Sequence, residues 1–290
     1  MESFQLDGDV NMSDIVIDAP TSSRTIQAEL NYLVSDGRKP VTFQYDPPPG
    51  VPKRSGVYRS HLVQISNARL APPPGALSLD RNGFELHRHA SALRDFSDRS
   101  AIETVYYDEA ERLLKDRTGA RKVVIFDHTL RDGSPERADG IREPVKYIHN
   151  DQTFVSGPRR VRDHLPADEA ERLLQGRVAI VNLWRPIGET VQSSPLALCD
   201  SRSIELNDLV ASDLVYPDKV GETYALVFNP QHHWYYFPNM TPEEFLLLKI
   251  YDSAGDSIAR LSAHTSFEDP TSPADAPPRR SIELRALLFF

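Results

Sequence analysis

The sequence is poor in cysteine, has an excess of acidic over basic residues and contains no long apolar run. Cys199 is its one cysteine, which excludes an internal disulfide or a thiolate metal cluster and favours a reducing, cytoplasmic location. No segment reaches the roughly 18 apolar residues that span a bilayer. The formal net charge of −9 argues against nucleic acid or an anionic membrane as partner. Residues 1–20 lack the basic and apolar regions of a signal peptide.

The composition is that of an ordinary folded protein, with 40% hydrophobic and 26% charged residues. Proline is abundant, at 23 residues, and forms runs at 47–49 and 72–74. Such runs cannot lie inside a helix or a central strand. We therefore expect one domain over 1–290, in which residues 1–104 wrap around the core as strands and loops and residues 122–290 form the core itself.

Most of the chain after residue 122 has the pattern of short strands. Amphipathic helices are expected over 105–115, closed by Gly119, and over 168–174. So many strands with so few helices predict a mainly β fold with flanking helices, a double-stranded β-helix (jelly roll, cupin-like). The expected strands are 40–45, 123–126, 145–151, 178–184, 196–199, 224–228, 233–237, 245–251, 263–267 and 282–290.

A His-x-Asp pair, His149 and Asp151, ends the expected strand 145–151. Side chains of a strand alternate with period two, so this spacing puts the imidazole and the carboxylate on one face. One distant histidine would complete a set of two histidines and one carboxylate. That set leaves coordination positions open and is the usual ligand set of non-haem Fe(II) oxygenases.

Arg279 and Ser281 are the candidates for binding a carboxylate cosubstrate. They alternate with Glu283 and Arg285 and so share one face of the last strand. The apolar tail 286–290 indicates that this strand runs through the core. The guanidinium fork of Arg279, assisted by Ser281, suits the far carboxylate of a 2-oxoacid such as 2-oxoglutarate.

Arg185 is a second candidate for binding a carboxylate, and its alternative role is a structural ion pair with Asp200 or Glu189.

Two histidines compete for the distal metal position, His264 and His232. In a barrel of this kind the distal histidine and the cosubstrate-binding arginine occupy the starts of neighbouring strands, which needs a short connection. His264 lies much nearer to Arg279 in the sequence than His232 does. Spacing therefore favours His264, and His232 becomes a residue of the cleft wall.

The aromatic residues that follow His232 are candidates for the wall of a substrate pocket. They are Trp234 and Tyr236, together with Trp184 from an earlier strand. Half of the aromatic side chains on this strand must face the core instead.

Six motifs resemble those of the mostly fungal hydroxylase/desaturase family, which includes gibberellin desaturase-like enzymes and relatives of the cephamycin methoxylase subunit. The resemblance runs from about residue 28 to the C-terminus. The motifs are VNLWRP (181–186), PLALCDSRS (195–203), NPQHHWYYF (229–237), LLKIYDS (247–253), AHTSFEDP (263–270) and RSIELRA (280–286).

The resemblance implies an oxidoreductase that uses Fe(II), 2-oxoglutarate and O2 to hydroxylate, desaturate or cyclise a small-molecule secondary metabolite by C–H abstraction. His149, Asp151 and His264 are then the expected iron ligands, and Arg279 with Ser281 the cosubstrate site. The oligomeric state is left open, with a homodimer as one candidate. The alternatives on the same fold are a metal-dependent cupin-type isomerase and a metal-free jelly-roll protein that binds small molecules.

Overall fold

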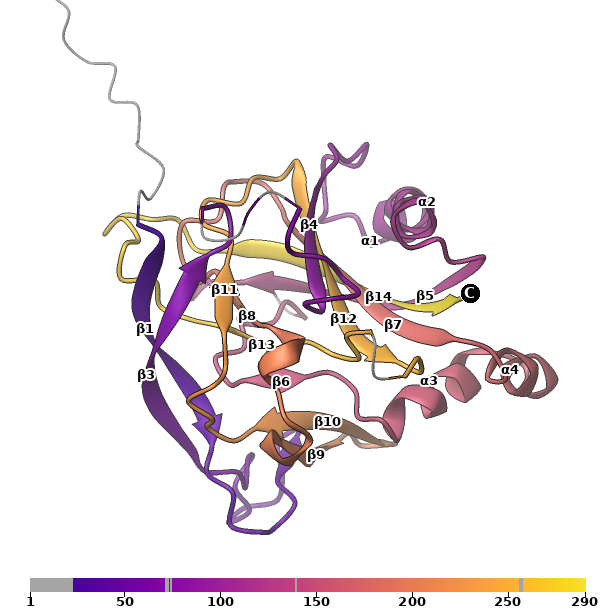
Figure 1. The fold of residues 1–290 in the computed structure, drawn as a ribbon, viewed down its shortest axis with the longest axis horizontal. Coiled ribbons are helices and arrows are strands. Elements are labelled where there is room, and N and C mark those ends of the chain that lie inside the picture. The colour runs from indigo at the N-terminus through magenta and orange to yellow at the C-terminus, as the bar shows by residue number, and fades with distance from the viewer. Residues whose placement is uncertain (1–22, 71–72, 74, 139, 256–257) are drawn as a thin grey trace, which may run out of the picture.

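Two curled β-sheets face each other and make up most of the molecule (Figure 1). The computed structural model describes residues 23–290 except 71–72, 74, 139 and 256–257. The larger sheet has nine strands and the smaller has five. The mainly β jelly roll predicted from the sequence is confirmed.

The five-stranded sheet is antiparallel throughout. Its order is β4 (Phe84–Arg88), β12 (Glu244–Asp252), β7 (Val178–Pro186), β14 (Arg280–Phe289) and β5 (Lys122–Asp132).

The nine-stranded sheet begins with β1 (Thr25–Leu33), β3 (Tyr58–Asn67), β11 (Trp234–Tyr236), β8 (Leu196–Cys199) and β13 (His264–Ser266). It continues with β6 (His149–Asn150), β10 (Val220–Leu226), β9 (Leu209–Val215) and β2 (Val41–Phe43).

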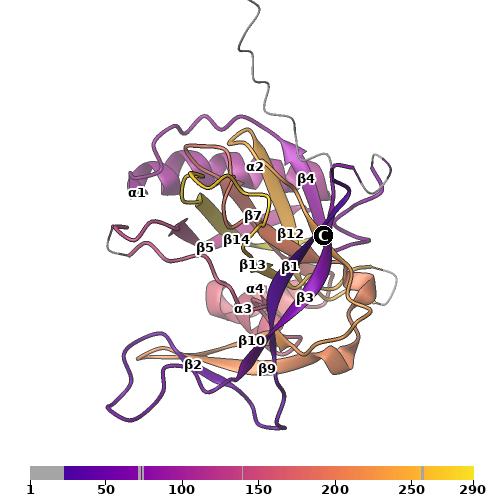
Figure 2. The same cartoon turned by 90° about the vertical axis from the view of Figure 1, so that its left-hand side faces the viewer.

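Helices cover the outside of the smaller sheet and one end of the molecule (Figures 1 and 2). The short turns α1 (Arg99–Ala101) and η1 (Ile102–Tyr106) lead into α2 (Tyr107–Thr118), which ends at Gly119 in the left-handed conformation at φ +75°. The others are α3 (Ser156–His164), α4 (Ala167–Leu173), η2 (Ser201–Ser203) and η3 (Leu206–Asp208). In the described residues no helix is long and apolar enough to cross a membrane.

Strand β14 is buried on both faces, and the two faces differ in chemistry. Ile282 and Leu284 belong to the apolar core under α2, which includes Leu113. The alternate residues Ser281 and Glu283 are also buried but polar. They face the space between the two sheets, where the functional candidates gather.

The N-terminal part of the chain contributes strands to both sheets. β1, β2 and β3 belong to the nine-stranded sheet, and β4 pairs with β12 in the other. Of these four, only β2 was expected, as part of 40–45. Strand β9 and helix α3 were also missed, and the expected strand 145–151 is reduced to His149–Asn150.

Candidate active site

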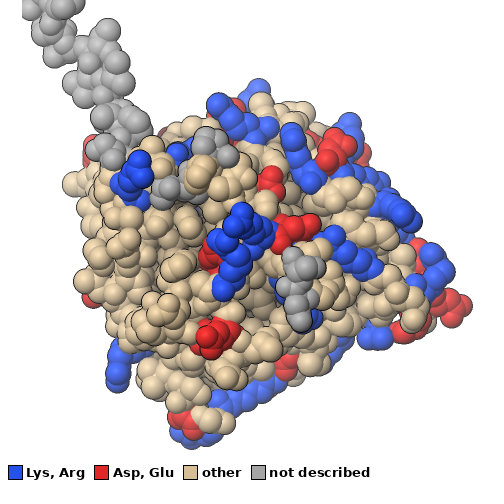
Figure 3. Space-filling model, in the orientation of Figure 1, with Lys and Arg blue, Asp and Glu red and all other residues tan. Residues whose placement is uncertain are grey.

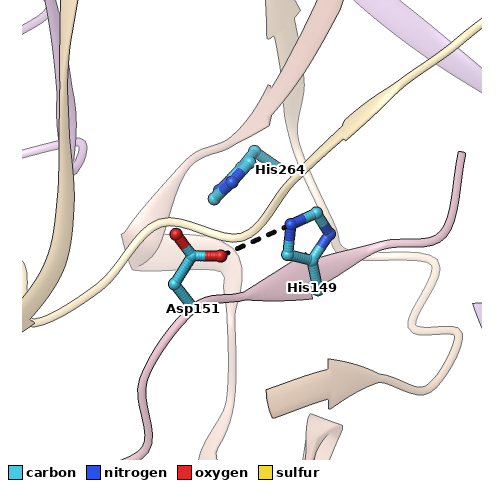
Figure 4. Close-up of side chains that lie close together, drawn as sticks. All are labelled: His149, Asp151 and His264. Carbon is cyan, nitrogen blue, oxygen red and sulfur yellow. Dashed lines mark ion pairs between the residues drawn. The ribbon is translucent and has the colours of Figure 1, made fainter. Parts of the chain in front are cut away.

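His149, Asp151 and His264 lie together on the inner side of the nine-stranded sheet (Figure 4). Each offers one ligating atom, and these atoms lie within 4.8 Å of one another. β13 places His264 directly opposite His149 of β6, with ring centroids 4.6 Å apart. Asp151 lies just past the end of β6, and its Oδ1 is 3.6 Å from Nε2 of His149. Two segments far apart in the sequence, 149–151 and the start of β13, thus present one group of ligands.

Backbone carbonyls orient both imidazoles of this group. Nδ1 of His149 lies 2.8 Å from the carbonyl oxygen of Tyr147, and Nδ1 of His264 lies 3.2 Å from that of Ser262. A carbonyl only accepts hydrogen bonds, so each Nδ1 carries the proton and each Nε2 keeps its lone pair. Within the described part of the chain neither Nε2 has a hydrogen-bond donor. This is the tautomer that binds a metal ion through Nε2.

The electrostatic setting favours the ligating forms of these side chains. Burial, and then the neighbouring His264, lower the pKa of His149 to about 4, so its ring is neutral near pH 7. Burial alone would raise the pKa of Asp151. The cation of Arg285, followed by His149, outweighs that effect and holds this pKa well below its usual range.

The outer oxygen of Asp151 is held by two residues that the sequence did not single out for this role. Oδ2 accepts hydrogen bonds from Nδ2 of Asn182 at 2.8 Å and from Nε of Arg285 at 3.0 Å. The same two side chains also bind Glu283, at 3.0 and 2.8 Å. Asn182 and Arg285 are cross-strand partners on β7 and β14, so the sheet register sets their position. The sequence signal for this position was the alternation of Arg285 with Arg279, which indicates that both side chains lie on one face of the strand.

Arg279 and Ser281 lie on the same inner face and have unused hydrogen-bonding atoms. Nη1 of Arg279 donates to the carbonyl of Ser194 at 2.7 Å. Its buried Nε and the buried Oγ of Ser281 have no partner among the described residues. Burial, and then the nearby cation of Arg131, lower the pKa of Arg279 to about 9. A buried guanidinium in this setting calls for an anion.

The distal histidine and the cosubstrate-binding arginine were expected at the starts of neighbouring strands. The two strands concerned, β13 and β14, lie in different sheets. His264 begins β13, and Arg279 immediately precedes β14. The two residues therefore come from opposing sheets instead of from one sheet edge.

Arg185 lies on the other face of the smaller sheet. It is paired with Ile282, so it points toward α2 and away from Arg279. Its guanidinium carbon lies 5.5 Å from the ring centre of Tyr106, and its Nη2 lies 3.7 Å from Oε1 of Glu109. Its ion-pair partner is therefore Glu109, not the expected Asp200 or Glu189. We leave Arg185 out of the proposed cosubstrate site.

His232 belongs to a separate buried cluster. Its Nε2 lies 3.1 Å from Oδ2 of Asp208, and its Nδ1 lies 3.2 Å from the hydroxyl of Tyr32. The same hydroxyl accepts a hydrogen bond from Nε1 of Trp234 at 2.7 Å. The structure thus brings His264, and not His232, to the His-x-Asp pair.

The remaining candidates for the pocket wall point elsewhere. Trp234 and Tyr236 belong to an apolar core that includes Ile148, whose side chain alternates with that of His149. The ring centre of Trp184 lies 5.6 Å from the guanidinium carbon of Arg279, so Trp184 flanks that arginine.

A cavity of about 540 Å³ opens beside the His-x-Asp pair. His149 and Asp151 line it, as do residues of β9, β10, the segment after β2 and the segment after β5. Its apolar walls include Phe126, Tyr58 and Leu214. The volume suits a small organic molecule.

Comparison with known proteins places the chain in one family. The family model described as "YDMC: Oxidoreductase/YMDC permease-like domain" matches residues 30–289. The "Hydroxylase/desaturase efuI" of Hormonema carpetanum is 35% identical over 257 residues, which cover 80% of this chain and 85% of that protein. The "Fe(II)/2-oxoglutarate-dependent dioxygenase nvfI" of Aspergillus novofumigatus is 31% identical over 278 residues, covering 92% and 98%.

A solved structure agrees with these relatives. The "iron and alpha-ketoglutarate-dependent endoperoxidase NvfI" superposes with a TM-score of 0.83 at 29% identity, covering 92% of this chain and 98% of that chain. The chain belongs to the fungal hydroxylase/desaturase family of Fe(II)/2-oxoglutarate-dependent dioxygenases. It is an oxidoreductase whose cofactors are Fe(II), 2-oxoglutarate and O2.

The residues of this chain fit those cofactors. Two imidazole nitrogens and one carboxylate oxygen lie within 4.8 Å of one another, a donor set that suits Fe(II). Nε of Arg279 and Oγ of Ser281, which have no partner among the described residues, suit one carboxylate of 2-oxoglutarate.

Proposed function

We propose that His149, Asp151 and His264 hold Fe(II), and that Arg279 and Ser281 bind the far carboxylate of 2-oxoglutarate. The observation that carries the iron assignment is the orientation of the two imidazoles. Both direct Nδ1 to a backbone carbonyl, which leaves two Nε2 lone pairs beside Oδ1 of Asp151. When bound, Fe(II), 2-oxoglutarate and O2 supply oxidation of an unactivated C–H bond coupled to decarboxylation of 2-oxoglutarate to succinate.

Asn182 and Arg285 position the carboxylate ligand. Both donate to Oδ2 of Asp151, so only Oδ1 faces the two imidazoles. A carboxylate held in this way contributes one ligand atom and leaves room for the cosubstrate and O2. Hydrogen bonds to metal-binding carboxylates fix orientation and tune affinity.

Arg279 anchors the cosubstrate from the opposing sheet. Its Nη1 is fixed on the carbonyl of Ser194, while its Nε and the Oγ of Ser281 stay available because neither has a partner among the described residues. Both atoms are buried, so an incoming carboxylate there is shielded from water. In low-dielectric surroundings the attraction between carboxylate and guanidinium is stronger than in water.

The substrate we propose is a small-molecule secondary metabolite that enters the cavity beside His149. The relatives are named hydroxylase/desaturase and endoperoxidase, and the reaction proposed here is hydroxylation, desaturation or ring formation. The cavity walls exclude water and direct one C–H bond of the substrate toward the iron site. A cytoplasmic location and a homodimer stay predictions.

The test is succinate release from 2-oxoglutarate by protein loaded anaerobically with Fe(II) and then exposed to O2. Turnover is expected in the wild type and should be stimulated by a substrate. Turnover and Fe(II) affinity that stay unchanged in a His149→Ala variant would overturn the assignment of His149 as an iron ligand. Turnover of a substrate without consumption of 2-oxoglutarate would indicate a cupin-type isomerase.

A further inference from the structure

The cavity beside His149 carries more positive charge than its acidic residues neutralise. Its basic side chains are Arg54, Arg131, Arg142, Arg160, Lys219 and Arg285, and its acidic side chains are Asp127, Glu143, Asp151 and Glu222. The acids are already engaged. Asp127 and Asp151 pair with Arg285, while Glu143 pairs with Arg137 and Glu222 with Lys39, which lie outside the cavity lining.

Three cations of the cavity have no acidic partner in the part of the chain that the structure describes. Among the described residues no carboxylate forms an ion pair with Arg54, Arg142 or Lys219. The chain as a whole has a net charge of −9, and basic and acidic side chains are interspersed on the face drawn in Figure 3. The excess of positive charge is therefore local to the cavity, because the chain as a whole is acidic.

Arg54 makes the closest aromatic contact of these three cations. Its guanidinium carbon lies 3.8 Å from the ring centre of Tyr147 and 5.5 Å from that of Tyr58. The backbone around it is tied to β2 by hydrogen bonds from Phe43 to Lys53 and from Ser55 to Val41, both 2.9 Å. Stacking of this kind fixes the guanidinium plane and leaves its N–H edge free.

The stacked tyrosine connects Arg54 to the proposed iron site. The carbonyl of Tyr147 accepts the hydrogen bond from Nδ1 of His149. The side chain of Arg54 has no hydrogen-bond acceptor in the described residues, and it shares the cavity with His149 and Asp151. Arg279 does not line this cavity, so Arg54 is not part of the proposed 2-oxoglutarate site.

We propose that the substrate is a carboxylic acid and that Arg54 binds its carboxylate. This inference rests on the proposed function, because it places the reacting part of that substrate beside His149 and Asp151. The guanidinium matches a carboxylate bidentately, and the apolar walls at Phe126 and Leu214 accommodate the remainder of the molecule. Arg54 is thus the residue that selects an acid over its neutral ester.

The experiment uses matched acid and ester pairs. Phenylacetate, cinnamate and naphthaleneacetate, each with its methyl ester, are titrated calorimetrically at pH 7 into protein holding Fe(II) and saturating 2-oxoglutarate without O2. Saturating 2-oxoglutarate prevents the probes from occupying the Arg279 site. At least one acid should bind ten times more tightly than its ester, and this ratio should fall with added salt.

Substitutions then test whether Arg54 causes the preference for the acid over the ester. Arg54→Gln should bring the ratio of acid to ester affinity close to one with little change in ester affinity, and Arg54→Lys should keep part of the preference. Arg59→Gln is the matched control, because Arg59 is exposed, lies outside the cavity lining and has no ion pair among the described residues. It should leave the ratio unchanged.

Three outcomes would overturn the inference. One is that no acid of the set binds the wild type more tightly than its ester. Another is a preference for the acid that survives Arg54→Gln. If that variant also unfolds at lower temperature, the role of Arg54 is only structural, through its contact with Tyr147. The third is a preference that added salt does not reduce. None of these would affect succinate release, so this inference and the proposed function fail separately.

Discussion

Two buried clusters of polar groups, each built around histidine and aspartate, differ in how far their atoms are satisfied. In the closed cluster, His232 uses both ring nitrogens, one on Asp208 and one on Tyr32. The hydroxyl of Tyr32 also accepts the indole N–H of Trp234. Burial lowers the pKa of His232 despite the opposing effect of Asp208. This cluster joins β1 to β11, and in the described structure both ring nitrogens of His232 are occupied, so neither is left to bind a ligand.

The open cluster consists of His149, Asp151, His264, Arg279 and Ser281. Among the described residues each histidine uses only Nδ1 for a hydrogen bond, and the buried Nε of Arg279 and Oγ of Ser281 have no partner. Leaving buried polar atoms unpaired costs stability. Both clusters contain histidine and aspartate, so residue types alone do not distinguish them. They differ in the buried polar atoms that have no hydrogen-bond partner among the described residues.

The strongest test of this contrast is Asp151→Ala. It should abolish iron-dependent succinate release, because it removes the only anionic ligand of the open cluster. The fold should persist, since Arg285 keeps Glu283 and Asp127 as partners. Circular dichroism checks the fold and succinate assays check turnover. A normal rate in this variant would remove the metal assignment.

A direct comparison of the two clusters uses His264→Ala and His232→Ala. The first should lose high-affinity Fe(II) binding in anaerobic titrations. The second should keep it but lower the free energy of unfolding by about 1–3 kcal/mol, because Asp208 and Tyr32 lose a buried partner. Loss of iron in the second variant alone would show that the clusters have been assigned the wrong way round.

Arg279→Ala should raise the apparent constant for 2-oxoglutarate ten- to a hundredfold, or about 1.4–3 kcal/mol, with little change in Fe(II) affinity. The reason is that the cosubstrate carboxylate loses its buried cation. Arg280→Ala is the control, because Arg280 is exposed on the opposite face of the strand. If Arg280→Ala had the larger effect, the cosubstrate would bind to the face of β14 that carries Arg280, not to the face that carries Arg279.

Asn182→Ala tests the support of the open cluster. Removing its hydrogen bond frees one side of Oδ2 of Asp151 and should weaken Fe(II) binding by about tenfold. Titration of apoprotein with Fe(II) measures this change. Unchanged affinity would mean that Arg285 alone orients the carboxylate.

Ser281→Ala should have the smallest effect. It removes one hydrogen bond from a carboxylate that keeps the charge of Arg279, which is worth about 0.5–1.5 kcal/mol. The apparent constant for 2-oxoglutarate should therefore rise only severalfold. An effect as large as that of Arg279→Ala would make the hydroxyl an equal partner.

Local patterns predicted much of this molecule. The strand at 196–199 and the cap at Gly119 follow from β-propensity and from the left-handed conformation that glycine permits. Strand β6 is shorter than expected, so Asp151 reaches the site from a bend just beyond the strand. Arg185 was a reasonable carboxylate binder by residue type, but its position on β7 turns it toward α2.

The sequence by itself determined the His-x-Asp pair, the single polar face of residues 279–285 and the mainly β class, because each depends on spacing within a few residues. Only the tertiary structure decided that His264 joins His149, that Asn182 and Arg285 hold Asp151, and which polar atoms stay free. Those contacts depend on the register between strands and on how the two sheets face each other. Alternation within a single strand carries no information about either, because it specifies a face and not the neighbour across it.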